Sequence, residues 1–193
     1  MKLYLHVDRK RLLNKGDVLS NTKYPNGNTA SLLSPILESD FLDHIMNLYN
    51  EGISPHGYNY LVEAATGTRS YLDWATELFF EYIRYKEFNS LPSRYQSIFG
   101  WSRLEDALSF DKKSPIYEIS NNNGCFIADI RLLKMDYDPS KQANNAKKYW
   151  KGEPLDSSLT YKPLWEYVIN IPVTVEKRID LRFYEGDAPY EIL

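Results

Sequence analysis

The chain has 193 residues, of which 43% are hydrophobic and 25% are charged, and its formal net charge is -3. These values are typical of an ordinary globular protein, and we expect one domain over residues 1–193. A mean hydropathy of -0.49 leaves no room for a membrane span, and the mildly acidic balance does not favour a nucleic-acid binder. The single cysteine, Cys125, excludes an intrachain disulfide, and the first segment lacks an apolar signal core. We therefore expect a cytoplasmic protein.

The first predicted element is a strand over residues 2–7. Leu3, Leu5 and Val7 alternate with Tyr4 and His6, so the pattern places His6 on the face opposite the core. A lone histidine at a strand end is often structural, and the strand pattern by itself leaves that reading of His6 open. Residues 19–34 are polar and rich in turn formers, and they predict a loop that folds over a ligand.

A helical lobe is predicted over residues 36–88. Ser39 or Asp40 is expected to cap a helix that ends at Gly52. Residues 68–88 then carry apolar side chains at helical spacing, which makes this segment the clearest helix in the chain. We interpret the lobe as an insertion after the first strand that packs against the sheet.

Residues 91–110, LPSRYQSIFGWSRLEDALSF, predict a strand, a turn and a helix that opens with a capping box at residues 102–105. In an extended run, alternate side chains share one face. The run places several candidate site residues on two faces: Arg94 on one, and Tyr95, Ser97 and Phe99 on the other.

Asn123 and Gly124 separate two apolar runs, residues 115–120 and 125–133. An Asn-Gly pair in this position is a strong hairpin signal. We therefore predict that the two runs are antiparallel neighbours.

The last long strand is predicted over residues 162–177, where Glu166 stands among apolar neighbours and Pro172 predicts a sheet edge or a break. A solvent-facing charge on an edge strand remains an alternative reading of Glu166. Together the elements predict the α+β class, with a mostly antiparallel sheet and flanking helices.

Several kinds of site are disfavoured by the residue patterns. Three dispersed histidines and one cysteine give no recognisable metal-ligand spacing. The sequence also lacks the glycine-rich phosphate loops and the GxSxG elbow of acyl-transfer enzymes. What remains is a strand histidine, an arginine beside a serine and aromatic strand, and a late strand carboxylate.

Short motifs along the chain resemble, in their order and spacing, a little-characterised family of bacterial proteins related to the ADP-ribosyltransferases. The motifs are PSR at residues 92–94, SIFGW at 97–101, LEDAL at 104–108, AKKYWKG at 146–152 and PLWE at 163–166. The resemblance runs from the first strand almost to the end. It implies an ADP-ribosyltransferase-like split sheet, with a helical insertion between the first strand and the central strand-helix unit.

The resemblance also implies an enzyme that uses NAD. Cleavage of the nicotinamide bond passes through an oxocarbenium-like state, which a carboxylate stabilises, and Glu166 is the candidate for that role. The other roles implied are a ribose contact for His6, a pyrophosphate contact for Arg94, stacking near nicotinamide for Tyr95 or Phe99, support of the site strand for Ser97, and a pocket wall for Trp150.

Two departures from the family pattern leave the acceptor open. No clear second-strand tyrosine is present, and position 164, two residues before Glu166, is Leu rather than an acidic residue. RNA, DNA or a protein therefore all stand as acceptors. By analogy with the family's neighbours, the chain would be the toxin of a toxin–antitoxin or phage-defence system, with an antitoxin as partner.

A second hypothesis is a catalytically inactive module that binds a nucleotide or a partner protein. The two hypotheses differ on whether His6, Arg94 and Glu166 converge on one cleft. If they lie on separate faces, the enzyme hypothesis fails.

Overall fold

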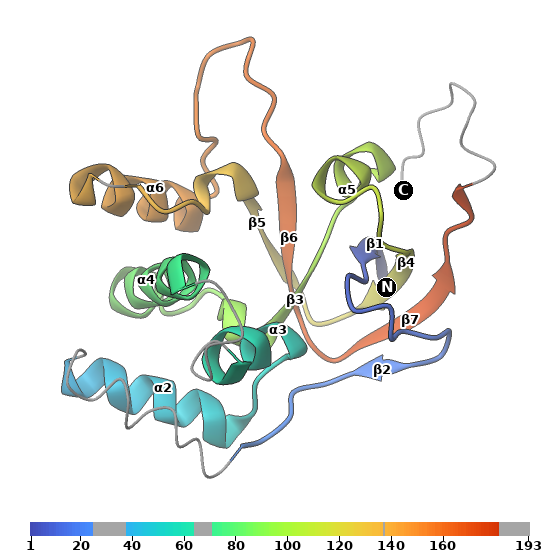
Figure 1. Cartoon of the computed structure of the whole chain (residues 1–193), viewed down its shortest axis with the longest axis horizontal. Helices are drawn as coiled ribbons and strands as arrows, with labels where there is room; N and C mark the ends of the chain where they lie inside the picture. The colour runs from blue at the N-terminus through green and yellow to red at the C-terminus, as the bar shows by residue number, and fades with distance from the viewer. Residues whose placement is uncertain (25–37, 64–70, 137, 182–193) are drawn as a thin grey trace.

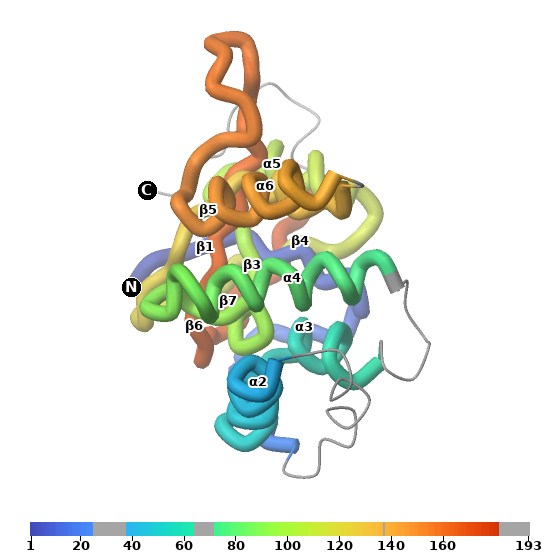
Figure 2. The backbone as a smooth tube through the Cα atoms, turned by 90° about the vertical axis from the view of Figure 1, so that its left-hand side faces the viewer, coloured from blue at the N-terminus to red at the C-terminus, as the bar shows by residue number. Residues whose placement is uncertain are grey.

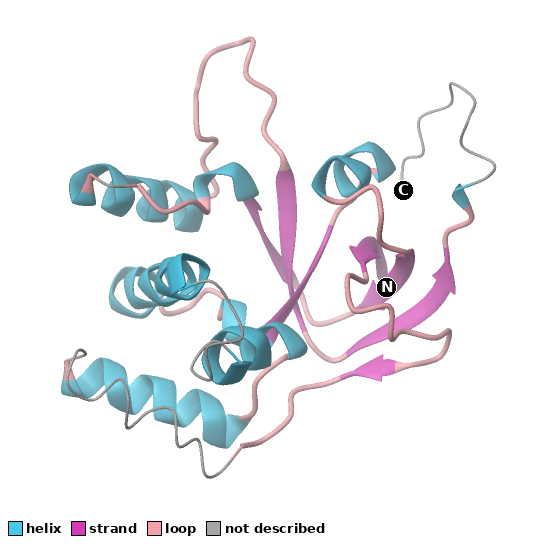
Figure 3. Cartoon of the chain, viewed as in Figure 1, coloured by secondary structure: helices cyan, strands magenta, loops and turns pink. Residues whose placement is uncertain are grey.

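The computed structural model describes residues 1–24, 38–63, 71–136 and 138–181. Two antiparallel sheets stand beside a stack of helices (Figures 1 and 3). The predicted α+β class is therefore confirmed. Most of the predicted loop over residues 19–34, and the start of the helix predicted from residue 68, lie outside the described residues.

The first sheet has the strand order β1-β4-β7-β2 and the second the order β3-β6-β5. The strands of the first sheet are β1 (Lys2–Val7), β2 (Val18–Leu19), β4 (Ile116–Asn121) and β7 (Val173–Arg178). Those of the second are β3 (Ser97–Gly100), β5 (Cys125–Asp129) and β6 (Trp165–Asn170). An antiparallel bridge between Leu5 and Trp101 joins the sheets, with two N–H···O bonds of 2.8 Å.

The hairpin predicted at Asn123 and Gly124 is wrong. Strand β4 pairs with β1 and β7, whereas β5 pairs with β6, so this turn carries the chain from one sheet to the other. Gly124 still supplies the turn with a left-handed φ of 83°.

The strand predicted over residues 162–177 is likewise two strands in different sheets, β6 and β7, and the break falls at Pro172 as expected. The two crossings lie against each other. Asn121 donates a side-chain hydrogen bond to the carbonyl of Asn170, Asn123 donates to that of Pro172 at 3.2 Å, and Asn170 donates to that of Asn123 at 3.1 Å. Asparagine amides therefore add to the backbone bond from the N–H of Asn170 to the carbonyl of Gly124, 3.3 Å, where the sheets exchange strands.

The N-cap of the first long helix is Glu38 and not Ser39 or Asp40, with no side-chain cap bond, so only some of the predicted end signals are followed by the helices. They are α2 (Ser39–Glu51), α3 (Pro55–Gly57), the π-helix η1 (Tyr58–Glu63), α4 (Tyr71–Glu87), the 3₁₀ turns η3 (Arg94–Gln96) and η4 (Ile130–Leu132), α5 (Leu104–Phe110) and α6 (Pro139–Lys151). The predicted end of α2 at Gly52 is confirmed. The predicted capping box is wrong, because α5 begins at Leu104 with Arg103 at the N-cap and no side-chain cap bond.

Helices α4 and α6 run side by side in front of the strands (Figure 2) and cover the three-stranded sheet. Phe80, Tyr149, Trp150 and Val168 form the buried centre of this layer. The indole N–H of Trp150 donates to the carbonyl oxygen of Phe80 at 2.8 Å, so its polar atom is satisfied inside the core. This layer forms the back of the site described next.

Trp150→Ala should lower the free energy of unfolding by about 3–5 kcal/mol, because the change opens a large cavity in a packed core. Urea unfolding measures the loss. The matched control is Leu159→Ala, since Leu159 is a large apolar side chain that is fully exposed, and its effect should stay within about 0.5 kcal/mol. Equal effects of the two substitutions would contradict this packing.

Candidate functional site

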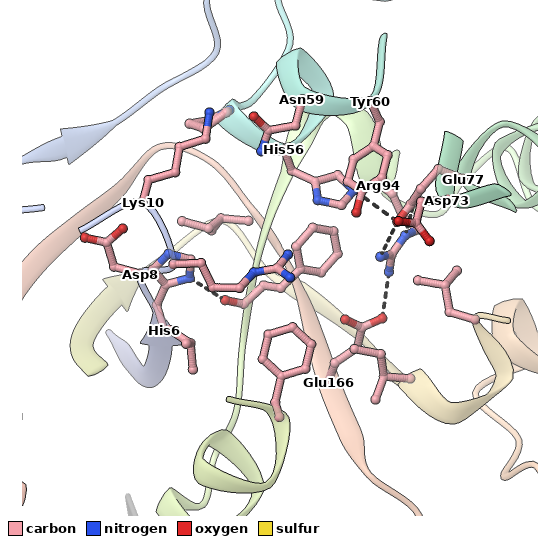
Figure 4. A pocket seen from close by; sticks show the side chains of 18 of the residues that line it. His6, Asp8, Lys10, His56, Asn59, Tyr60, Asp73, Glu77, Arg94 and Glu166 are labelled. Carbon is pink, nitrogen blue, oxygen red and sulfur yellow. Dashed lines mark hydrogen bonds and ion pairs between the residues drawn. The ribbon is translucent and has the colours of Figure 1, made fainter. Parts of the chain in front are cut away.

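A cavity of about 720 Å³ lies where the two sheets meet the helical lobe. Its walls come from the end of β1 and the residues after it, from β3 and β6, from α3 and η1, from the first half of α4, and from the segment after η4. Figure 4 shows side chains from these separate segments pointing toward a common space. The volume suits a nucleotide-sized ligand, since small-molecule sites span about 300–1,000 Å³.

Four of the residues singled out in the sequence line this one cavity: His6, Arg94, Phe99 and Glu166. They come from β1, η3, β3 and β6, which are far apart in the sequence. The convergence that the enzyme hypothesis requires is therefore present.

The floor of the cavity is a buried ionic cluster around Arg94, whose side chain is only 3% exposed. Its Nε and Nη2 donate to the two carboxylate oxygens of Glu77 at 2.8 and 2.9 Å. Its Nη1 donates to Glu166 Oε1 at 2.6 Å. The hydroxyl of Tyr149 lies against Nη1 and donates to the same oxygen of Glu166 at 2.7 Å. Arg94 thus links helix α4 to strand β6.

The cluster holds one cation and two carboxylates. Burial on its own would raise the pKa of Glu77, but Arg94 and His56 outweigh it and hold that pKa well below the ordinary value. Burial lowers the pKa of Arg94, and the two carboxylates outweigh that effect and raise it. One positive and two negative groups give a formal charge of +1 - 1 - 1 = -1. The cavity floor therefore carries an uncompensated negative charge.

Glu166 is 1% exposed and still lines the cavity. In the part of the chain that the structure describes, both of its hydrogen bonds reach Oε1, from Arg94 and from Tyr149. Figure 4 shows that oxygen turned to Arg94 and the other turned away from it. One oxygen fixes the carboxylate in place, and the second is available to a ligand.

His6 forms a hydrogen bond from Nδ1 to the carbonyl oxygen of Phe99, 2.7 Å away. A carbonyl only accepts, so Nδ1 carries the proton and Nε2 keeps its lone pair. Burial lowers the pKa of His6, although the carbonyl and Asp8 oppose that shift. The ring is therefore a neutral hydrogen-bond acceptor near pH 7.

His56 and Glu77 are site residues that the sequence reading missed. The Nε2 atom of His56 lies 3.2 Å from Glu77 Oε1, and its ring is packed between Tyr60 and Phe99, with centroid distances of 4.6 Å to each. Burial lowers the pKa of His56, and Glu77 partly offsets this. A signal for Glu77 was present: Glu77, Glu81 and Arg84 repeat at i, i+4 and i+7, and all three are buried.

Three of the expected site residues do not line the cavity. Tyr95 is fully buried in the helical lobe, Ser97 donates to the carbonyl of Ser93 at 2.7 Å, and Trp150 lies in the core behind the floor. Trp150 as a pocket wall and Tyr95 as a stacking residue are therefore not supported by their positions, whereas Phe99 does line the cavity. For Arg94, the pyrophosphate contact stays a prediction, and its pairing with two carboxylates weighs against it.

Residues 4–181 match a protein family described as "Protein of unknown function (DUF2441)". The chain belongs to this family. No curated protein matches the chain. Across the described part of this DUF2441 protein, no cluster of three or more His, Cys, Asp or Glu residues could hold a metal ion. None of its described helices is long and apolar enough to cross a membrane.

Arg94→Gln should destabilise this DUF2441 protein by about 3–5 kcal/mol at pH 7, because two buried carboxylates lose their partner. The wild-type pKa of Glu77 is held below 4.5, so the pair stabilises the fold above about pH 4.5 and the stabilisation is lost as the pH falls. In the variant, burial raises the carboxylate pKa, so the deficit should shrink between pH 7 and pH 5. Urea unfolding of the wild type and the variant at both pH values measures this loss of unfolding free energy.

The control for that experiment is Arg103→Gln, since Arg103 pairs with Glu105 on the surface and its loss should cost no more than about 1 kcal/mol. A deficit of Arg94→Gln that is as large at pH 5 as at pH 7 would contradict the charged cluster.

Tyr95→Phe should leave stability unchanged or raise it by up to about 1–3 kcal/mol. Among the described residues, the buried hydroxyl of Tyr95 has no hydrogen-bond partner, and an unsatisfied buried polar group is costly. Thermal unfolding measures the change, with Tyr149→Phe as the control that removes a paired hydroxyl and should destabilise. Destabilisation by Tyr95→Phe would mean that its hydroxyl has a partner.

Proposed function

We propose that this DUF2441 protein is an NAD-dependent ADP-ribosyltransferase with an ADP-ribosyltransferase-like split sheet. It would move ADP-ribose from NAD to a macromolecular acceptor, either a nucleic acid or a protein. The observation that carries the proposal is the convergence of His6, Arg94 and Glu166 on one nucleotide-sized cavity. The resemblance of the sequence motifs to relatives of the ADP-ribosyltransferases supports the choice of reaction.

The charge of the floor suits the chemistry. When the bond between the ribose C1′ and nicotinamide breaks, the bonding pair leaves with nicotinamide and positive charge develops on the ribose. The Arg94 cluster has one negative charge more than it has positive charges. A fixed, preorganised negative charge beside a developing cation lowers the barrier more than a mobile one. Glu166, held by Arg94 and Tyr149, would supply it.

Other residues that line the cavity would bind the separate parts of NAD. His6 offers Nε2 as an acceptor for a ribose hydroxyl, and Phe99 offers a flat apolar ring for nicotinamide. Arg94 is engaged by carboxylates, so the pyrophosphate would instead meet the exposed cations at the rim, Arg9 and Lys134.

The setting of the activity is a hypothesis that rests on the sequence resemblance. In that hypothesis the protein is a cytoplasmic toxin of a toxin–antitoxin or phage-defence system, and an antitoxin protein holds the transferase inactive.

A second candidate function is an inactive module of the same fold that binds a nucleotide or a partner protein. One observation favours it: Glu166 is 1% exposed, and one of its oxygens already accepts two hydrogen bonds. A carboxylate used only to neutralise Arg94 would have the same contacts.

Glu166→Gln should cut nicotinamide release from NAD by about 100-fold or more, because the amide keeps the shape and the acceptor atom but loses the charge. The assay uses NAD labelled in the nicotinamide for release and NAD labelled in the adenylate for transfer in a cell lysate. Nuclease or protease treatment of the lysate then names the acceptor class.

The matched control is Glu118→Gln. Glu118 is also a buried strand carboxylate, with Lys177 3.5 Å away, but it does not line the cavity. Its release rate should equal that of the wild type. NAD binding without nicotinamide release in the wild type would favour the binding module, and the absence of both would contradict either reading.

A further inference from the structure

We infer that His56, backed by Glu77, takes the proton from the acceptor during transfer, and that the acceptor atom is therefore a hydroxyl oxygen. The inference rests on the proposed ADP-ribosyl transfer and adds to it the class of acceptor. It starts from a histidine of the cavity that lies within ion-pair distance of a buried carboxylate.

The geometry of the pair fixes which nitrogen can act. Nε2 of His56 lies 3.2 Å from Glu77 Oε1, within ion-pair distance but outside hydrogen-bond geometry, and the negative carboxylate favours the proton on this nitrogen. Nδ1 then keeps its lone pair, and none of the hydrogen bonds of the described residues involves it. Figure 4 shows the ring at the wall of the cavity, above the floor where Glu166 lies. A base on one wall and a cation-stabilising carboxylate on the floor leave the space between them for the reacting atoms.

The two cavity histidines differ in the group that contacts the ring nitrogen of each. His6 Nδ1 bonds to a neutral carbonyl, whereas His56 Nε2 faces a carboxylate. An imidazole that gains a proton becomes a cation, and a carboxylate stabilises that cation far better than a carbonyl does. His56 is therefore the base, and His6 stays the neutral acceptor that binds ribose.

The proton balance selects the acceptor class. A hydroxyl keeps its proton near pH 7 and must lose it as its oxygen bonds to the ribose C1′. In that step the C1′–N bond breaks, nicotinamide leaves with the bonding pair, the C1′–O bond forms, and the hydroxyl proton moves to His56 Nδ1.

Several charged or titratable groups surround His56. Glu77 and Asp73 come from α4, Arg94 from η3, Glu166 from β6 and Tyr60 from η1, while Asp8 and Lys10 follow β1. Burial lowers the pKa of His56 below 6.5, with Glu77 and Glu166 acting upward and Arg94 downward. The base is thus free above that pKa, and transfer should rise with pH to a plateau below neutrality.

The test compares two reactions of the same site. Transfer to a hydroxyl is measured with methanol as the acceptor, as the sum of methyl ADP-ribose and ADP-ribose formed from NAD. Exchange of free labelled nicotinamide into NAD breaks and reforms the same C1′–N bond but moves no proton. His56→Gln should lose hydroxyl transfer by about 100-fold or more while it keeps nicotinamide exchange, whereas Glu166→Gln should lose both.

The matched control is His44→Gln. His44 also faces a buried glutamate, Glu81, at 2.9 Å, but it lies outside the cavity, so both reactions should keep their wild-type rates. The wild type adds a test that needs no variant: the ratio of hydroxyl transfer to exchange should rise with pH below 6.5, because His6 titrates in both reactions and His56 acts in transfer alone.

The outcomes separate the two proposals. No nicotinamide release or exchange in the wild type overturns the transferase itself. Release and exchange with unchanged hydroxyl transfer in His56→Gln, or a ratio of transfer to exchange that does not change with pH in the wild type, overturns only the role of His56. Transfer to a guanidine compound such as agmatine in preference to methanol overturns the acceptor class.

Discussion

The site depends on the pairing of Arg94 with two carboxylates from a helix and a strand that are far apart in the sequence. Glu77 comes from the helical lobe and Glu166 from the second sheet, and each would be costly to bury alone. The guanidinium holds both at fixed positions, with Tyr149 completing the contacts of Glu166. The same pairing therefore attaches the lobe to the sheet and sets the negative charge of the cavity floor. Stability and the proposed chemistry share one arginine.

Features of the fold that depend on local sequence were predictable. The first strand follows from alternation, and the end of α2 at Gly52 follows from a glycine stop signal. The assignment of strands to sheets was not predictable in the same way. The turn at Asn123 and Gly124 forms as its residues require, but turn chemistry does not specify whether the next strand pairs with the previous one or enters another sheet.

The site was predictable in part for the same reason. His6 and Glu166 lie on regular strands, where alternation and the family resemblance suffice to single them out. Tyr95 was misplaced because residues 94–96 form a 3₁₀ turn, in which side chains do not alternate between two faces. Glu77 was missed although it repeats with Glu81 and Arg84 at helical spacing, because a charged residue within an apolar helix is usually taken to face solvent.

The asparagine hydrogen bonds between the two crossings join the two sheets at one end. They tie the sheets together where β4 and β6 end, and the Leu5–Trp101 bridge ties them again further along β1. The hydrogen bond between His6 Nδ1 and the carbonyl oxygen of Phe99 is a further contact between the sheets. The strand walls of the cavity are thus joined to each other by several contacts between the sheets, whereas Lys10 and Met135 line the cavity with exposed side chains.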